Sequence, residues 1–122
     1  MTISVIVPCY NEEESLPLFF AEMEKIKPRL HDTIEYIFIN DGSQDRTLEV
    51  LHDLNMLDSN VHFISFSRNF GKEAALYAGL QHATGDYVTV MDVDLQDPPE
   101  LLVKMKKMLD EQEDLDLSLI HI

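Results

Sequence analysis

The sequence has little cysteine and little positive charge. Its 122 residues include one cysteine and nine lysines and arginines, against 23 aspartates and glutamates. The single Cys9 cannot form an intramolecular disulfide, which is typical of a protein from a reducing compartment. The net charge of −14 disfavours nucleic acid or an anionic membrane surface as a sequence-independent partner, because both would repel the chain. An anionic ligand would therefore need a cation to mediate its binding.

Long apolar runs are also absent from the sequence. No run approaches the ~20 residues that are needed to span a bilayer. Residues 1–4 lack the basic region and the long apolar core of a signal peptide. These absences predict a cytoplasmic chain that is not itself transmembrane. At this length the chain fits a single domain that buries roughly two-thirds of its unfolded surface.

Strand-like and helix-like segments alternate four times along the chain. Short apolar runs rich in β-branched residues predict strands, and apolar residues at helical spacing predict the helices between them. The expected strands are 3–8, 34–40, 61–66 and 87–90. The expected helices begin near residues 13, 43, 69 and 98, and Pro28 is expected to end the first. This alternation predicts an α/β fold with a mainly parallel sheet and right-handed crossovers.

Polar residues follow each predicted strand, and they are candidates for a binding site. The four polar segments are 10–12, 41–43, 68–69 and 92–94. Parallel strands bring their carboxyl ends to one edge of a sheet, and ligands of such sheets bind at that edge, where the strand order reverses. The sequence therefore predicts one site built from four loops.

The last of these segments predicts a metal site. Asp92 and Asp94 lie two residues apart, so in an extended chain their side chains fall on the same side, and Gln96 adds an amide oxygen at the next step. Two carboxylates and an amide suit Mg²⁺ or Mn²⁺, with positions left for water and diphosphate oxygens. A pair of aspartates in this spacing is also common in ordinary polar loops, so the pair alone does not settle the assignment.

Four motifs together resemble a known family, the inverting GT-A glycosyltransferases. They are residues 5–12, 40–45, 68–73 and 92–99, and the likeness extends from residue 3 to about 110. Within that family the chain is similar to the polyprenyl-phosphate sugar transferases, and more to the bactoprenol glucosyltransferases than to the dolichol-phosphate mannose synthases. The resemblance implies a Rossmann-like, mainly parallel sheet with helices on both faces.

The resemblance also implies a reaction and a set of site residues. The reaction is transfer of a hexose, in this branch glucose, from a UDP-sugar to a polyprenyl phosphate with inversion. The residues implied at the nucleotide sugar are Pro8, Tyr10, Glu12, Asp41 and Lys72. The residues implied at the metal are Asp92, Asp94 and Gln96, of which the two aspartates are also the implied catalytic residues.

These implied roles agree with the chemistry of the side chains. Asp41 can accept a hydrogen bond from the imide N–H of uracil, and Tyr10 can lie against the base. A metal that bridges the phosphates would neutralise charge on the leaving nucleoside diphosphate. A lipid phosphate is largely dianionic at neutral pH, so this nucleophile needs little help from a general base.

Simpler roles remain open for several of these residues. Asp41 could be only a turn former, Asp45 only a helix cap, and Lys72 only a solvated helix residue. We expect Cys9 to be a packed side chain and not a nucleophile, because no basic neighbour in the sequence would lower its pKa.

Two other classes of protein combine an α/β sheet with acidic side chains. A metal-dependent nucleotidyltransferase is the main alternative, but it would be expected to carry a glycine-rich basic loop where this chain has residues 10–13. A phosphorylation-type response domain would place its acids after the first strand, whereas here they follow the fourth.

The end of the sequence predicts a change of organisation. Residues 1–110 are interpreted as the nucleotide-sugar-binding part of a GT-A domain, and 111–122, acidic and then apolar, as a truncated or non-native tail in which a fifth strand is also possible. Family members continue with an acceptor-binding portion and membrane helices. The resemblance therefore implies a lipid-phosphate acceptor and a place at the cytoplasmic face of the membrane for the full-length protein. It also leaves a homo-oligomer possible, and it predicts that this segment alone is inactive.

Overall fold

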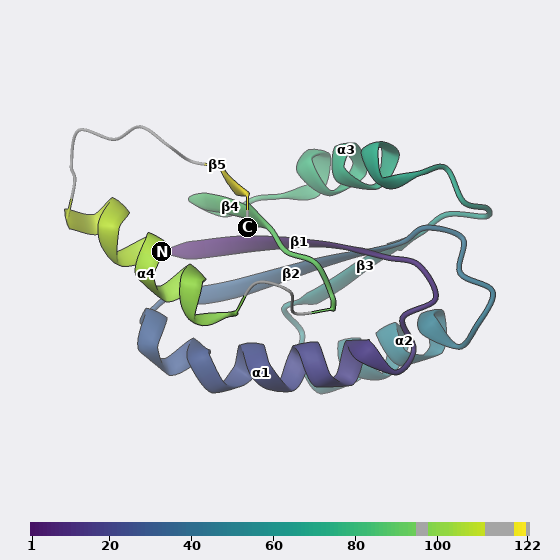
Figure 1. Ribbon diagram of the computed structural model, residues 1–122, viewed down its shortest axis with the longest axis horizontal. Helices are drawn as coiled ribbons and strands as arrows, with labels where there is room; N and C mark the ends of the chain where they lie inside the picture. The colour runs from purple at the N-terminus through teal and green to yellow at the C-terminus, as the bar shows by residue number, and fades with distance from the viewer. Residues whose placement is uncertain (95–97, 112–118, 122) are drawn as a thin grey trace.

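A computed structural model of the chain describes residues 1–94, 98–111 and 119–121. All of its strands are parallel and form one sheet with the order β3-β2-β1-β4-β5 (Figure 1). The strands are β1 (Thr2–Cys9), β2 (Thr33–Asn40), β3 (Val61–Ser65), β4 (Tyr87–Val90) and β5 (Leu119–His121). The four strands expected from the sequence are present, and the fifth, which the sequence left open, pairs with β4.

Helices cover both faces of the sheet. They are α1 (Ser15–Leu30), α2 (Thr47–Leu57), α3 (Lys72–His82) and α4 (Glu100–Glu111). Figure 1 shows α1 and α2 below the sheet and α3 above it. Leu102 of α4 is buried in the same apolar cluster as residues of α1, so α4 lies on the α1 side. The predicted α/β class with helices on both faces is confirmed. None of the described helices is long and apolar enough to cross a bilayer.

The central strands are apolar on both sides because both sides are covered. On the α1 side the rings of Phe19, Tyr36 and Phe38 pack together, with Tyr36 stacked on Phe38 at 5.7 Å between centroids. On the α3 side a smaller cluster forms around Ile6 and Ile39 of the sheet. Runs of this kind are what a parallel sheet buried on two faces requires.

The first helix differs from the prediction at both ends. It begins at Ser15 and continues through Pro28 to Leu30, so the expectation that Pro28 ends it is wrong. A proline removes one N–H donor and so one hydrogen bond of the helix, but only two helical residues follow Pro28, so most of the helix is unaffected. The helix ends at His31, whose φ of 58° is left-handed.

The fourth crossover differs in hand from the first three. From β1 to β3 the chain steps in one direction with α1 and α2 on one face, and it steps back to β4 with α3 on the other face, so these connections share one hand. From β4 to β5 it continues in the second direction with α4 on the α1 face. The prediction of one common hand therefore holds for the first three crossovers, whereas β4, α4 and β5 are arranged in the opposite hand, an exception to a strong rule.

Candidate functional site

The loops after β1 and β2 are joined by hydrogen bonds at the carboxyl edge of the sheet. The N–H of Asn11 donates to Ser43 Oγ at 2.9 Å, and Asn11 Oδ1 accepts from the N–H of Gln44 at 2.8 Å. Asn11 has a φ of 53°, a left-handed conformation that asparagine tolerates better than most residues. The second helix was expected to begin near residue 43, but α2 begins only at Thr47, and the hydroxyl of Ser43 accepts from the neighbouring loop instead.

The carboxylate of Asp45 accepts hydrogen bonds from the first residue of α2 and from the loop that leads into α1. Its Oδ1 accepts from the N–H of Thr47 at 2.9 Å, and its Oδ2 accepts from the N–H of Glu13 at 3.2 Å. Asp45 therefore accepts from the first amide of α2, although Arg46 and not Asp45 occupies the N-cap position, and the contact with Glu13 was not expected from the sequence. Burial raises the pKa of this carboxyl, but hydrogen bonds from Thr47 and Glu13 outweigh it and lower the pKa.

Asp41 organises the loop between β3 and α3. Its carboxylate is buried and accepts from two backbone amides, Phe70 N–H at 2.7 Å and Gly71 N–H at 3.1 Å. Asn69 Nδ2 donates to the Asp41 carbonyl at 3.2 Å. Gly42 follows at a φ of 69°, and a Cβ there would overlap the backbone of that loop. Asp41 is thus more than a turn former.

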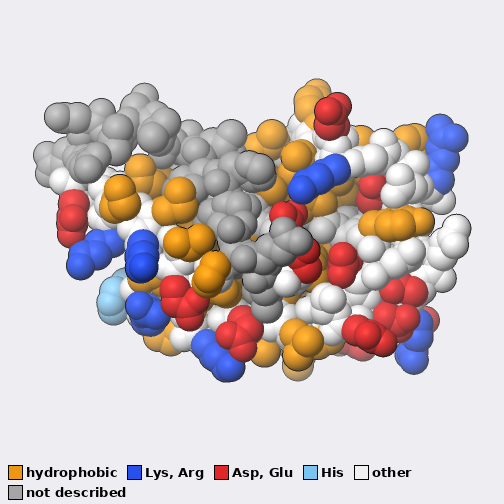
Figure 2. Space-filling view, viewed as in Figure 1, with side chains coloured by type: hydrophobic (Ala, Val, Ile, Leu, Met, Phe, Trp, Pro, Cys, Tyr) orange, Lys and Arg blue, Asp and Glu red, His pale blue; other side chains and the backbone are white. Residues whose placement is uncertain are grey.

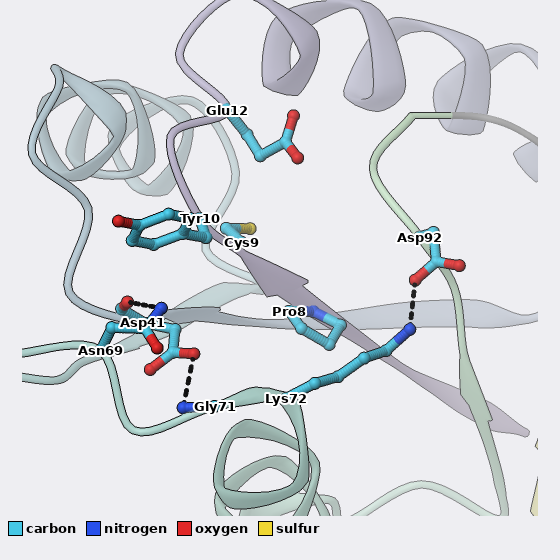
Figure 3. A pocket seen from close by; sticks show the side chains of 9 residues that line it. All are labelled: Pro8, Cys9, Tyr10, Glu12, Asp41, Asn69, Gly71, Lys72 and Asp92. Atoms are coloured by element: carbon cyan, nitrogen blue, oxygen red, sulfur yellow. Dashed lines mark hydrogen bonds and ion pairs between the residues drawn. The ribbon is translucent and has the colours of Figure 1, made fainter.

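Lys72 reaches from the first turn of α3 to the loop after β4. Its Nζ lies 3.1 Å from Oδ1 of Asp92, and the side chains of Lys72 and Asp92 are 55% and 37% exposed. Lys72 is thus a largely exposed helix residue, as the simpler interpretation has it, and it also forms an ion pair with Asp92. Figure 3 shows its side chain extending past Pro8 toward Asp92.

Most of the predicted site residues lie around one cleft of about 310 Å³. The predicted residues that line it are Pro8, Tyr10, Glu12, Asp41, Lys72 and Asp92 (Figure 3). The sequence interpretation gave no role to Asn69 and Gly71, which also line it, although both belong to a quoted motif. Asp94 follows two residues after Asp92 and does not line the cleft, and Gln96 lies outside the described residues.

The cleft is electrostatically acidic near Glu12. Burial raises the pKa of this carboxyl, a hydrogen bond with Ser15 lowers it, and the charges of Asp94, Asp45 and Asp92 raise it further. These carboxylates act on one another at the place where a cation is expected. Figure 2 shows acidic side chains gathered over the loops that enter α1 and α2.

The donor set partly fits a divalent cation. Carboxylate oxygens are the ligands that Mg²⁺ and Mn²⁺ prefer, and the raised pKa of Glu12 is evidence of negative charge that a cation would relieve. However, within residues 1–94 and 98–111 no group of three acidic, histidine or cysteine side chains is close enough to hold a metal. Two aspartates with water and phosphate oxygens as further ligands are the set that remains.

Cys9 is a packed residue beside the cleft. It is 1% exposed, and its Sγ donates to the Val7 carbonyl at 3.4 Å. Burial, with a smaller contribution from the charge of Glu12, raises the pKa of the thiol well above its ordinary value. The prediction that Cys9 is not a nucleophile agrees with this environment, because the thiolate is the reactive form.

Comparison with known proteins identifies the family. Residues 4–120 match the family described as Glycosyl transferase family 2. The chain belongs to this family. Among family relatives it is 49% identical over 108 residues to the bactoprenol glucosyl transferase of Shigella phage SfX, covering 86% of this chain and 34% of that protein. It is 48% identical over 102 residues to the prophage bactoprenol glucosyl transferase homolog of Escherichia coli (strain K12), covering 84% and 33%.

The chain spans about a third of the length of these curated relatives. Among solved glycosyltransferases, the fold resembles S. aureus TarS 1-349 in complex with UDP-GlcNAc, with a TM-score of 0.72 at 25% identity over 93% of this chain and 32% of that one. It also resembles the mannosyltransferase PcManGT from Pyrobaculum calidifontis in complex with GDP-Man and Mn²⁺, with a TM-score of 0.64 at 25% identity over 85% and 31%. The predicted family and the GT-A fold class are confirmed.

Proposed function

We propose that this family 2 chain is the donor-binding part of a hexosyltransferase, with residues 1–110 forming that part. The full-length enzyme would transfer glucose from UDP-glucose to a polyprenyl phosphate with inversion. The observation that carries the proposal is the cleft, where residues from all four loops of the carboxyl edge meet. Relatives named bactoprenol glucosyl transferase support the glucose donor and the polyprenyl acceptor.

The base and ribose would bind at the Tyr10 and Asp41 side of the cleft. Tyr10 is 44% exposed, so its ring has a face available for stacking on uracil. The Asp41 carboxylate already accepts two N–H groups, and each oxygen has a further lone pair for the imide N–H of the base. Pro8 and Glu12 would complete the walls on either side.

The diphosphate would lie toward Lys72 and the aspartates. Lys72 would contact phosphate oxygens, and Asp92 and Asp94, with Gln96, would hold Mg²⁺ or Mn²⁺. The bound cation would neutralise charge on the leaving UDP. A neighbour whose structure contains GDP-Man and Mn²⁺ supports this combination of ligands.

Attack by the acceptor phosphate would need no general base from the protein. A lipid phosphate that is largely dianionic at neutral pH can attack the anomeric carbon without a general base, and a single displacement inverts that centre. Among the described residues that line the cleft there is no Ser/His or Cys/His pair. We place the full-length enzyme at the cytoplasmic face of the membrane, where a polyprenyl phosphate could reach the cleft.

Isothermal titration calorimetry tests the proposal. UDP should bind in the presence of Mn²⁺ and much more weakly with excess chelator, because the acidic cleft repels a diphosphate. GDP should bind more weakly than UDP by ~1.5–3 kcal/mol, the value of a hydrogen bond to a charged acceptor. Equal UDP affinity with Mn²⁺ and with chelator would contradict the metal site, and a preference for GDP would favour a mannose donor.

A further inference from the structure

Lys72 is the cation of the cleft. Among the described residues that line it, Lys72 alone carries a positive charge, and its Nζ binds Asp92 at 3.1 Å. The charges of Asp92, Asp94 and Asp45 all act on the nearby Glu12. Lys72 therefore balances part of the negative charge at the position proposed for the metal.

The carboxylate of Asp92 therefore has two cationic partners, Lys72 and the proposed metal. Asp92 Oδ1 faces the ammonium of Lys72, whereas the proposed function gives the same carboxylate to Mg²⁺ or Mn²⁺. An ammonium and a divalent cation repel each other, so each weakens the binding of the other to one carboxylate unless a further anion lies between them. A diphosphate is such an anion, because its oxygens can bind the metal and accept from Lys72 together.

The structure allows the side chain of Lys72 to move while its backbone stays in place. The preceding loop is fixed by the bonds from Phe70 and Gly71 to Asp41. The Lys72 side chain is more than half exposed. Lysine has a flexible four-carbon stem, so its ammonium can change partners without a change in the fold.

We propose that Lys72 and the divalent cation compete for Asp92. When the cation binds, the ammonium of Lys72 moves from Asp92 to the oxygens of the donor diphosphate. This inference rests on the proposed function. Lys72 then couples the two ligands, because the metal releases Lys72 toward the diphosphate and the diphosphate frees Asp92 for the metal. Such coupling is reciprocal, so each ligand strengthens the other by the same factor.

The competition is open to direct measurement with Mn²⁺ alone. In Lys72→Met, Mn²⁺ should bind about two- to fivefold more tightly than in the wild-type chain, the range expected from removing one partner of an exposed ion pair. The difference should shrink as salt is added, because salt screens the pair. Lys104→Met is the matched control, since Lys104 is exposed on α4 and its loss changes the net charge equally.

The nucleotide provides the second measurement. The factor by which Mn²⁺ strengthens UDP binding should fall about two- to fivefold in Lys72→Met, should stay unchanged in Lys104→Met, and should be largely restored in Lys72→Arg. Tighter Mn²⁺ binding cannot result from a damaged fold, so it separates competition from a structural role. If Mn²⁺ bound Lys72→Met no more tightly than the wild type while UDP binding to the wild type still depended on the metal, the inference would be overturned and the proposed metal site would stand. Metal-independent UDP binding in the wild type would overturn the proposed metal site and the inference together.

Discussion

Two carboxylates of the cleft lie in different surroundings. Asp41 is buried, and both of its oxygens accept backbone N–H groups. Glu12 lies near other carboxylates that, with burial, raise its pKa, so the fold opposes its charge. The first side chain shapes a loop, and the second adds to the negative potential that attracts a cation.

Replacement of Asp41 by asparagine should destabilise the protein. The new amide group would present N–H donors where one carboxylate oxygen now accepts from Phe70 or Gly71, and it would leave a part-buried donor without an acceptor. We expect a loss of ~1–3 kcal/mol in the free energy of unfolding, measured with urea. Asp53→Asn on the exposed side of α2 is the control, and an equal effect in both variants would contradict the role of Asp41.

The raised pKa of Glu12 predicts that the wild type and the Glu12→Gln variant differ in stability by an amount that depends on pH. Because its pKa in the folded state is raised from 4.5, its contribution to stability is present at low pH and is lost as the pH rises through the raised value. Glu12→Gln should therefore be more stable than the wild type at neutral pH, and the difference should vanish in acid. Urea unfolding between about pH 4 and pH 8 measures it. A constant difference across this range would exclude the electrostatic cause.

The contact between α3 and the sheet depends on one glycine. A Cβ at Gly79 would overlap the side chain of Ile6 and press against Ile39. The buried residues of α3, Ala75 and Gly79, are both small, and this lets the helix pack close to β1 and β2. This packing fixes α3, whose first residue is Lys72.

Gly79→Ala should lower stability although alanine is the better helix former. The propensity gain is about 1 kcal/mol, whereas overpacking of a filled interior costs about 1–3 kcal/mol. We expect a net loss, measured by urea unfolding, while Gln81→Ala on the exposed side of the same helix should change little. A more stable Gly79→Ala variant would show that the sheet can yield to the added methyl group.

The sequence predicts the strands well because their signal is local. The runs around Val5, Ile37 and Phe63 are apolar and β-branched or aromatic, and each forms a strand within about two residues of the expected ends. Helix ends were less predictable, because they depend on contacts between distant residues. Ser43 looks like a cap, yet it serves Asn11, 32 positions away.

The sequence predicts which residues meet at the site better than it predicts the contacts between them. Motif order correctly brings Tyr10, Asp41 and Asp92 to one edge, since parallel strands must meet there. The bonds from Asp41 to the β3–α3 loop and from Lys72 to Asp92 link positions 20 to 30 residues apart. No local pattern encodes such pairs, which depend on the strand order.

Lysine and arginine side chains occur at both ends of the face shown in Figure 2, and several of them lie at the end where α1 finishes and α4 lies. Arg29, Lys106 and Lys107 line a second pocket of about 250 Å³ at that end. Among the described residues that line the cleft, Lys72 alone is positively charged.

This scarcity of cations predicts binding without turnover. Transfer needs a donor diphosphate and an acceptor phosphate held together, and the described lining offers one lysine for both. Loss of acceptor positioning can forfeit ~7–11 kcal/mol of barrier reduction. With UDP-glucose, Mn²⁺ and a short-chain polyprenyl phosphate in detergent, residues 1–122 should bind donor but form no glycolipid. Robust product would place the acceptor site within these loops.

The strand order has a consequence for synthesis on the ribosome. Ile3 of β1 pairs with Tyr87 of β4, and the neighbouring pair Thr2 and Asp86 is 84 positions apart. At ~5–20 residues per second, that edge of the first strand waits about 4–17 s for its native partner. During this time a strand that is largely buried in the folded protein presents unpaired backbone groups, an arrangement prone to pairing with another chain. Nascent chains should therefore need protection until the fourth strand has emerged.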